Sequence, residues 1–298
     1  MTRDQLTNTV VMISPGHFGF NKQTANTNSF QHEISDSETE VQNKALHEFN
    51  EMVDKLKKVN INVLVLSSRK DVVTPDSIFP NNWFSHHQKE KLIVYPMLTE
   101  NRRAERQVTE LKQLLKTSSI SVKEVVDLTE DEKDGMILEG TGSLVLDRQH
   151  KVAFAMESPR TTHQEFNKWC QIMDYEGVFF HAYDAKNFPI YHTNVTMNIG
   201  EKFAIVCLES IRDKVERHYL ENKLKKLGKE IISITVDQMS QFCGNVLQLL
   251  SNDGESIITM SETAFSGFTE TQHKILQKYG KIITVRVPTI EMVGGGSA

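Results

Sequence analysis

Two residue types that cooperate in proton transfer occur in short polar motifs of this 298-residue sequence. Glu139 lies in the motif LEGTG, and His192 lies 53 residues later in the motif YHTN. A carboxylate and an imidazole that meet in a water-poor cavity shift each other's pKa toward the working range and can act as an acid and a base. Alone, either residue is more often a turn or structural residue, so the chemistry depends on whether the fold brings the two together.

Similar short motifs recur along the whole chain at a regular step. The marker residues are Asn82 in FPNNW, Glu139, His192, Cys243 in FCGN and Gly295 in GGGS, and the steps between them are 57, 53, 51 and 52 residues. Such a step indicates a repeat architecture. Because the inner strand ends of a radial array converge, we expect Glu139 and His192 to become neighbours.

Each motif introduces the same series of elements: a short apolar strand, a turn, a second strand, an amphipathic helix and a third strand. The clearest copy runs from LEGTGSLVLD through KVAFAMES and a helix to GVFFHAYD. Its helix is predicted to begin with a capping box of Thr162 and Glu165. Apolar residues at helical spacing are then expected to face a sheet, namely Phe166, Trp169, Cys170 and Met173.

The other units are predicted to contain helices over 101–117, 211–227 and 266–279. A fifth unit is divided between the two ends of the chain: VVMIS, a helix over 38–58 and INVLVLSS come first, and its remaining strand is expected after Gly296. We therefore predict an α/β fold, a five-bladed ββαβ pseudo-symmetric propeller in which each unit buries its apolar face against its neighbours. Residues 1–298 are interpreted as a single catalytic propeller domain, truncated at the C-terminal side before the last inner strand.

Composition and charge limit the partners. A formal net charge of −5 and a pI near 6.1 provide no basic surface for nucleic acid, so a small molecule is the expected partner. The sequence has no signal-peptide pattern and no run of eighteen apolar residues, which favours a cytoplasmic protein without a membrane partner. The three cysteines share no CxxC spacing, so neither a metal site nor a disulfide framework is predicted. The sequence does not decide whether the protein forms a homo-oligomer.

Several motifs together resemble a known group of enzymes. LEGTGSLVLD is similar to the catalytic-Glu motif, and YHTN to the His-containing motif, of the guanidine-modifying superfamily of amidinotransferases, dimethylargininases and arginine deiminases. DSIFPNNWFS and ESPRTT resemble two substrate-binding segments of the same superfamily. With SPGHFGFNKQTANTNSFQ and VGGGSA added, the chain most closely resembles the citrulline-utilisation hydrolase branch, and the likeness spans essentially the whole chain. The resemblance implies the pentein propeller fold.

The resemblance also implies roles for individual residues. Glu139 would hold the N–H groups of the substrate head, and His192 would pass a proton to the leaving ammonia. Arg160 would bind the α-carboxylate as a planar fork, and Asp76 would bind the α-ammonium. Phe79 belongs to the same substrate-binding segment.

Two differences from the superfamily point to the substrate. Asn82 and Asn194 stand where relatives that bind a guanidinium carry aspartates. A guanidinium has only donors and needs acceptor carboxylates, whereas a ureido group also presents a carbonyl that an asparagine amide can satisfy. These asparagines favour citrulline over arginine, although an asparagine can also serve simply as a turn former.

The nucleophile is expected at a glycine loop. In the superfamily a cysteine thiolate follows such a loop, and Gly294, Gly295, Gly296 and Ser297 resemble its beginning. The cysteine would then follow Ala298, and the chain as given would be inactive. Two alternatives stay open: GGGSA is an artificial flexible linker, or Cys243 is the nucleophile. Cys170 and Cys207 are assigned to the core.

The predicted function is hydrolysis of the C–N bond of the ureido group of citrulline to ornithine, ammonia and carbon dioxide, through a Cys-His-Glu mechanism. His192 is expected to work near its natural pKa, and no metal or organic cofactor is needed. One alternative is an arginine deiminase or dimethylargininase acting on a guanidino substrate. The other is a propeller that binds an amino acid without catalysis.

The remaining polar segments receive simpler interpretations. Residues 15–37 form a long loop typical of a lid, and Phe18, Asn21 and Asn28 are expected to cover the bound substrate. The pairs His86-His87 and Arg102-Arg103 are interpreted as solvated surface residues.

Overall fold

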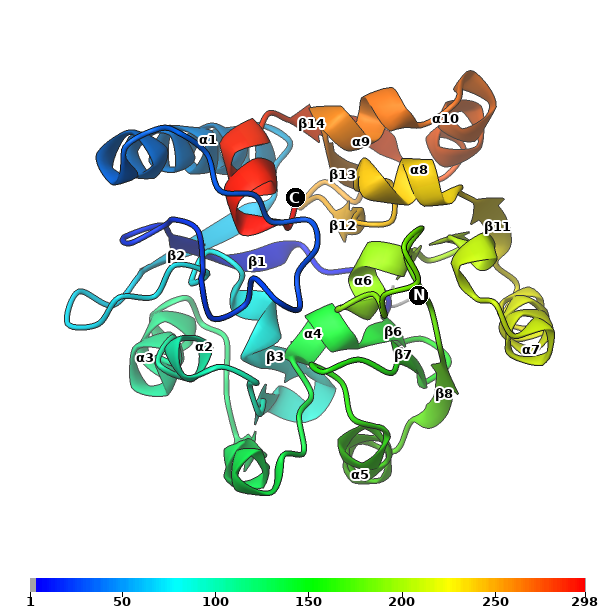
Figure 1. The fold of residues 1–298 in the computed structure, drawn as a ribbon, viewed down its shortest axis with the longest axis horizontal. Coiled ribbons are helices and arrows are strands. Elements are labelled where there is room, and N and C mark those ends of the chain that lie inside the picture. Colours follow the sequence, from blue (N-terminus) through cyan, green and yellow to red (C-terminus); the bar gives the residue numbers. More distant parts are fainter. Residues whose placement is uncertain (1–3, 298) are drawn as a thin grey trace.

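The computed structural model describes residues 4–297. Its strands form five separate small sheets, four of three strands and one of two. Figure 1 shows the sheets and their covering helices placed around the middle of the molecule. The mixed α/β class is the one that the sequence predicts.

The four larger sheets share one internal order. In each, the first strand pairs antiparallel with the second, and the second pairs parallel with the third after a helical crossover. Their strands are β3 (Phe84–His87), β4 (Lys91–Val94) and β5 (Glu124–Asp127); β6 (Val145–Asp147), β7 (Val152–Met156) and β8 (Glu176–Phe180); β9 (Met197–Ile199), β10 (Phe203–Val206) and β11 (Glu230–Ser233); β12 (Leu247–Leu250), β13 (Ser256–Ser261) and β14 (Lys281–Val285). This is the order predicted for one repeat unit.

The fifth sheet contains β1 (Thr9–Ser14) and β2 (Asn62–Ser67), which pair in parallel with Thr9 opposite Asn62. Between them lies α1 (Glu38–Lys58), which begins with a capping box of Ser37 and Glu40. The buried face of α1 contains Val41, Ala45, Glu48, Phe49, Val53 and Leu56. The additional strand expected after Gly296 falls outside the described residues.

Two of the predicted helices are each divided in two. The segment 101–117 forms α2 (Glu100–Arg103) and α3 (Val108–Thr117), because Gln107 between them has a non-helical backbone with φ −127° and ψ 57°. The segment 266–279 lies in α9 (Glu262–Gly267) and α10 (Glu270–Gln277), because Thr269 is extended and caps the second helix. The predicted helix 211–227 is α7 (Lys214–Lys226), since Asp213 caps its start.

The helix of the clearest repeat, α5 (His163–Met173), has only half of its predicted capping box. The Thr162 hydroxyl accepts from the Glu165 amide at 3.4 Å, but the Thr162 amide donates to the Ile137 carbonyl at 2.8 Å rather than to Glu165. The short α8 (Val236–Ser240) and the short 3-10 segments η2 (Gln88–Glu90), η3 (Thr129–Asp134) and η4 (Leu208–Ser210) complete the connections outside the centre.

The motif segments do not begin strands directly. Three of them make a single helical turn first, η1 (Pro80–Asn82), α4 (Gly140–Ser143) and α6 (Thr193–Thr196), whereas Cys243 lies in a non-helical turn before its strand. α4 contacts both η1 and α6, and the Thr193 hydroxyl donates to the Ser143 carbonyl at 2.7 Å. Figure 1 shows α4 and α6 near the centre, so the repeat motifs gather there.

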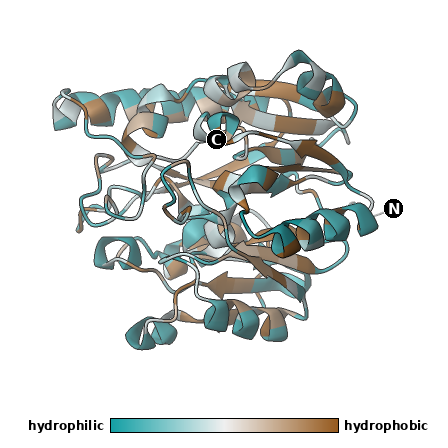
Figure 2. Cartoon of the chain, turned by 45° about the vertical axis from the view of Figure 1, so that its right-hand side comes forward, coloured by the Kyte–Doolittle hydropathy of each residue, from teal (hydrophilic) through white to brown (hydrophobic). Residues whose placement is uncertain are grey.

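Apolar strands lie between these central turns and the outer helices. Figure 2 shows hydrophobic residues concentrated on the strands, while the outer helices carry much of the hydrophilic surface. Phe166, Trp169 and Cys170 of α5 are buried, as predicted. His87, however, is 6% exposed and its Nε2 lies 2.6 Å from the Ser85 hydroxyl, so its interpretation as a solvated residue is wrong. Within residues 4–297, no helix combines the length and apolarity needed to cross a membrane.

Candidate active site

The centre of the molecule brings the predicted acid and base together. The Nε2 atom of His192 lies 2.8 Å from Oε2 of Glu139, and the two residues are 4% and 1% exposed. Each residue directly precedes a one-turn helix, Glu139 before α4 and His192 before α6. The Glu139 backbone amide donates to the Arg160 carbonyl at 3.2 Å, which ties the two motifs of one repeat together.

The electrostatics of this pair differ from the expectation. Burial alone would raise the pKa of Glu139, but Arg160, His192 and Arg102 together lower it to about 2. Burial lowers the pKa of His192 to about 4, and Glu139 only partly opposes this. The expectation that His192 works near its natural pKa is therefore wrong, because the imidazole is removed from water. At neutral pH the pair consists of a carboxylate and a neutral imidazole.

Arg160 lies beside the pair and is 2% exposed. Its Nη1 lies 3.6 Å from Oε2 of Glu139, and its Cζ lies 4.8 Å from the centre of the Tyr191 ring. Its Nη2 donates to the Thr27 hydroxyl at 2.9 Å and to the Thr24 carbonyl at 3.4 Å. The guanidinium thus presents its fork to the segment 15–37.

Asp76 is 3% exposed, and its two carboxylate oxygens differ. Oδ2 accepts from the Asn21 side-chain amide at 2.6 Å, whereas Oδ1 is buried without a hydrogen-bond partner. A buried carboxylate oxygen normally accepts a hydrogen bond, and an ammonium group could donate one to Oδ1 of Asp76.

Arg102 was expected in solvent and is instead 2% exposed. Its Nε donates to Glu105 Oε1 at 2.7 Å and its Nη2 donates to Glu105 Oε2 at 3.0 Å. Burial alone would lower the pKa of Arg102, but the carboxylates of Glu105, Asp76 and Glu139 raise it, so the guanidinium stays charged. The repeat pattern could have predicted this position, because Arg102 and Arg160 both follow the second strand of a repeat unit.

Asn82 connects this second arginine to the centre. It is 4% exposed, and in the amide orientation that satisfies its neighbours its oxygen accepts from Arg102 Nη1 at 2.9 Å and Nη2 at 3.2 Å. Asn194, the other asparagine of interest, is only partly buried in α6, and among the described residues no side-chain hydrogen bond joins it to the Glu139–His192 pair. The structure therefore brings Asn82, but not Asn194, into the polar network.

The glycine loop is packed against the site. It follows a short π-helical turn, η5 (Ile290–Gly294), and a Cβ added at Gly294 or Gly296 would lie 2.9 Å from the Phe79 ring. The Ser297 hydroxyl donates to Glu291 Oε1 at 2.6 Å, and Gly295 has φ +66°, which favours glycine. The alternative of a flexible linker does not agree with these contacts.

The segment 15–37 covers the same centre. The Asn28 side chain donates to the Gly294 carbonyl at 3.2 Å, and Asn21 contacts Asp76 as described above. Gln31 holds the segment together, since it accepts from the Thr24 hydroxyl at 3.0 Å and donates to the Asn21 carbonyl at 2.9 Å. Phe18 is 3% exposed and packs with Val285, Val287 and Ile290. All three predicted lid residues are therefore buried at this face.

The three thiols are not arranged for nucleophilic attack. Burial raises the pKa of Cys170 and Cys243 to about 12 and that of Cys207 to about 11. Cys243 donates to the Ala264 carbonyl at 3.3 Å, and in the described part of the chain no hydrogen bond joins any thiol to His192. The same part of the chain contains no group of three or more His, Cys, Asp or Glu residues that could hold a metal ion.

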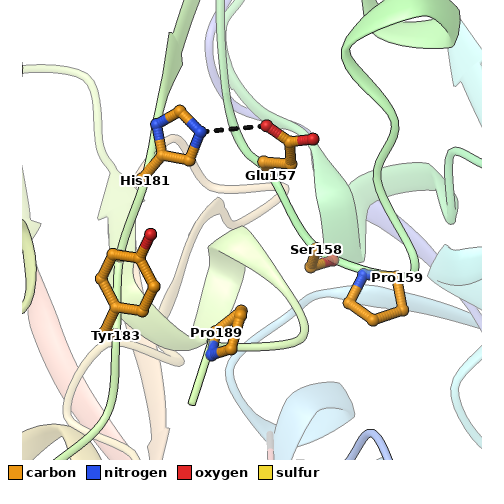
Figure 3. Close-up of a pocket in the computed structure, with 7 residues that line it drawn as sticks. Glu157, Ser158, Pro159, His181, Tyr183 and Pro189 are labelled. Atoms are coloured by element: carbon orange, nitrogen blue, oxygen red, sulfur yellow. Dashed lines mark hydrogen bonds and ion pairs between the residues drawn. The ribbon is translucent and has the colours of Figure 1, made fainter. Parts of the chain in front are cut away.

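A separate open cleft of about 400 Å³ is lined in part by Ser158 and Pro159, which directly precede Arg160 in the chain. Figure 3 shows Glu157 and His181 joined by an ion pair above Ser158, Tyr183 and the two prolines that line the cleft. Its lining is Glu157, Ser158, Pro159, His181, Ala182, Tyr183 and Pro189, which includes none of the predicted site residues.

Comparisons with known proteins agree with this architecture. A family model described as N,N dimethylarginine dimethylhydrolase, eukaryotic, matches residues 14–298. No curated protein matches the chain. Among solved structures, apo ArgZ, an arginine dihydrolase from the ornithine-ammonia cycle in cyanobacteria, is similar with a TM-score of 0.73 and 17% identity; the match covers 97% of this chain and 39% of ArgZ.

Shorter relatives match over most of their length. The N-terminal domain of ArgZ bound to product has a TM-score of 0.72 and 16% identity, with 97% of this chain and 94% of that domain covered. DDAH from Pseudomonas aeruginosa, a mutant complexed with citrulline, has a TM-score of 0.66 and 14% identity, with 98% and 96% covered. At these identities the likeness of the structures shows a shared fold.

Proposed function

This chain belongs to the N,N dimethylarginine dimethylhydrolase family, eukaryotic, and from that premise we propose that it is a hydrolase of a C–N bond in the head group of an arginine-like amino acid, with the ureido group of citrulline as its substrate. The observation that carries the proposal is the buried Glu139–His192 pair, with Arg160 3.6 Å from Glu139 and the buried Asp76 carboxylate bonded to Asn21 of the segment that covers this centre. An acid-base pair with a cation and a partly unpaired carboxylate beside it matches the two ends of an α-amino acid.

The charges around the site support a free amino acid as ligand. Arg160 presents a planar fork suited to an α-carboxylate, which would replace the Thr27 hydroxyl and the Thr24 carbonyl. Asp76 has a buried oxygen without a donor, which an α-ammonium would satisfy. Each end of the amino acid would thereby meet a group of opposite charge.

Asn82 and Arg102 support a neutral head group. The Arg102 guanidinium lies 2.9 Å from the Asn82 amide oxygen, and Glu105 already pairs with it through both of its carboxylate oxygens. A substrate guanidinium near Asn82 would place a second cation beside Arg102 without a further carboxylate from this motif. A ureido group brings no charge, and its carbonyl can accept from an amide.

In the proposed reaction, neutral His192 takes the proton of a thiol that follows the Gly294–Ser297 loop, and the resulting thiolate attacks the ureido carbon. The C–N bond to the terminal nitrogen breaks, and ammonia leaves with a proton from His192. Water then gives a proton to His192 and attacks the thiocarbamate, which releases the thiol, ornithine and carbon dioxide. Glu139 holds the head group and stabilises the imidazolium that forms during the reaction.

The source of the thiol is part of the proposal. Because the three thiols of this sequence are buried with raised pKa values, we expect the nucleophile to follow the Gly294–Ser297 loop, and we expect the 298-residue chain by itself to bind substrate without turnover. We also propose that the five sheets are the blades of a pseudo-symmetric propeller, since four share one strand order and their motifs recur at a regular step.

Calorimetric titration of the chain with citrulline, arginine and N,N-dimethylarginine tests the substrate. We expect citrulline to bind at least about tenfold more tightly than either cation, a difference of about 1.4 kcal/mol. Tighter binding of a guanidino compound would reject citrulline as the substrate. It would favour a guanidino substrate, as the names of the family and of the arginine dihydrolase relatives suggest.

An assay of ornithine and ammonia release tests catalysis. It should be run on this chain and on a form that continues beyond the glycine loop with a cysteine. Turnover only in the second form supports the proposal. Binding without turnover in both forms supports the remaining alternative, a propeller that binds an amino acid without catalysis.

A further inference from the structure

Tyr191 lies between the two parts of the site that must act on one substrate. Its ring is stacked against the guanidinium of Arg160, with Cζ 4.8 Å from the ring centre, and its hydroxyl donates to the Gly295 carbonyl at 2.5 Å. The side chain is 5% exposed. One residue thus contacts both the carboxylate-binding arginine and the glycine loop.

The backbone around Tyr191 fixes it relative to Arg160. The Ser158 hydroxyl donates to the Tyr191 carbonyl at 2.8 Å and accepts from the Arg160 amide at 3.1 Å. Ser158 therefore joins the chain after β7 to the chain before α6. The positions of the ring and the guanidinium are set by the same hydroxyl.

The hydroxyl is kept as a donor by its surroundings. Burial raises the pKa of Tyr191, so the phenol stays protonated throughout the neutral range. Its acceptor, the carbonyl of Gly295, belongs to a residue with φ +66°, and the Gly295 amide is held by the Glu291 carbonyl at 2.9 Å. The hydrogen bond from Tyr191 thus fastens the turn of the loop.

We infer that Tyr191 is a positioning residue that sets the distance between the Arg160 guanidinium and the Gly294–Ser297 loop. The inference rests on the proposed function, since Arg160 is taken to hold the substrate carboxylate and the loop to present the nucleophile. A substrate held at Arg160 is then placed at a fixed offset from the loop. Misplacement by about an ångström at this point is enough to slow a reaction strongly.

Two substitutions separate the two contacts of the side chain. Tyr191→Phe keeps the ring against Arg160 and removes the hydrogen bond to Gly295. Tyr191→Leu removes both contacts and keeps an apolar side chain. The measurements are backbone amide exchange over residues 290–297 and calorimetric affinity for citrulline, arginine and the decarboxylated citrulline analogue (4-aminobutyl)urea.

For Tyr191→Phe we expect exchange at 294–297 to rise at least about tenfold, while the affinity for the best amino-acid ligand changes less than about threefold. For Tyr191→Leu we expect the same rise in exchange and a loss of affinity of about tenfold for that amino acid, with less than about a threefold change for the decarboxylated analogue. The carboxylate-dependent loss is the signature of a displaced Arg160.

Other outcomes overturn the inference. If Tyr191→Phe leaves loop exchange unchanged, the hydroxyl does not fasten the loop. If Tyr191→Leu weakens the analogue as much as the amino acid, the residue only supports packing. Should the leucine variant fail to fold, the phenylalanine variant still decides the loop contact. Failure of the wild-type chain to bind any amino acid would reject the proposed function, while the exchange measurement would still test the contact between Tyr191 and Gly295.

Discussion

Gly142 shows how closely the catalytic groups are packed. A Cβ placed on this residue would lie 2.4 Å from the side-chain amide of Asn82 and 2.8 Å from the ring of His192. Neither neighbour can move freely, because Asn82 and His192 are both nearly fully buried. The space beside the imidazole therefore exists only because residue 142 has no side chain.

We predict that Gly142→Ala displaces His192 or Asn82 and weakens citrulline binding by roughly tenfold or more, about 1.4 kcal/mol. Calorimetry measures the affinity, and thermal unfolding shows whether the fold persists. Gly19→Ala is the matched control, since nothing lies within 4 Å of a Cβ there. Unchanged affinity in Gly142→Ala would show that this glycine does not shape the ligand site.

Glu165 is a buried residue that the proposed reaction does not use. It is 0% exposed, and a side-chain hydrogen bond with Asp131 is among the causes that raise its pKa. Burial, followed by the negative charge of Asp131, raises the pKa of Glu165 to about 7 from the model-peptide value of 4.5. The folded protein thus holds this proton more tightly than the unfolded chain does.

The sign of the resulting pH dependence follows from linkage. Between pH 4.5 and about 7 the unfolded chain loses the proton while the folded protein keeps it, so the stability of the wild type falls as pH rises through this window. We predict that the free energy of unfolding of Glu165→Gln, relative to that of the wild type, is about 1–2 kcal/mol higher at pH 8 than at pH 5. Urea unfolding at both pH values measures this, with Glu33→Gln as the exposed control. An equal difference at both pH values would contradict the prediction.

Individual residues also show what the sequence could reveal. Glu139, His192, Arg160 and Asp76 lie in recognisable motifs, and the structure gathers them at one place. Arg102 was predicted to face solvent because a charged residue in an amphipathic segment normally does so. Only the tertiary fold turns it inward onto Glu105. The lowered pKa of His192 likewise depends on burial, which no local pattern specifies.

At the scale of elements, local signals located helices better than they located helix ends. The capping box of Ser37 and Glu40 marks the start of α1, and the caps Asp213 and Thr269 explain why α7 and α10 begin later than predicted. The interruption at Gln107 carries no proline or glycine. Just before it, Arg102 and Glu105 are buried and paired with each other, an arrangement that a pattern of apolar residues alone could not reveal.

The segment 15–37 closes the site through its own hydrogen bonds. Gln31 joins the Thr24 hydroxyl to the Asn21 carbonyl, and through these residues it supports the contacts with Arg160 and Asp76. If the segment must open to admit substrate, the side chain of Gln31 helps to set how often it does so.

We predict that Gln31→Ala raises amide exchange over residues 21–31 about tenfold, because two hydrogen bonds of about 0.5–1.5 kcal/mol each are lost. The global unfolding midpoint should change little, and saturating citrulline should restore part of the protection. Lys22→Ala, at an exposed position of the same segment, is the control. Unaltered exchange would show that the segment is held closed by its other contacts.

For the whole molecule, separate small sheets must be held together around the centre. Among the described residues no strand of one sheet pairs with a strand of another, and side chains supply several of the links between sheets. Arg148, which directly follows β6, reaches His87 of β3, and Gln5 donates to the carbonyls of Leu146 and Ile199 in two neighbouring sheets. The regular step of the motifs predicted the repeated units, but these links between units have no sequence pattern of their own.

Lys229 and Asp147 form the most deeply buried of these links. Their side chains are both 0% exposed, and Nζ lies 3.0 Å from Oδ2. Lys229 precedes β11 and also donates to the carbonyls of Gly200 and Glu201, while Asp147 ends β6 and accepts from the His150 amide. The pair therefore joins the sheet β6–β8 to the sheet β9–β11.

We predict that Lys229→Met lowers the free energy of unfolding by about 3–5 kcal/mol, because it leaves the Asp147 carboxylate buried without its cation. Asp147→Leu should be destabilising by a similar amount for the converse reason. The double variant should lose about 2 kcal/mol less than the sum of the two, since neither charge then remains unpaired. Urea unfolding at pH 7 measures all three, and Lys278→Met, which breaks the exposed pair with Glu230, should change stability by less than about 1 kcal/mol. Additive losses in the double variant would mean that the two residues act separately, and that other contacts hold these two sheets beside the site.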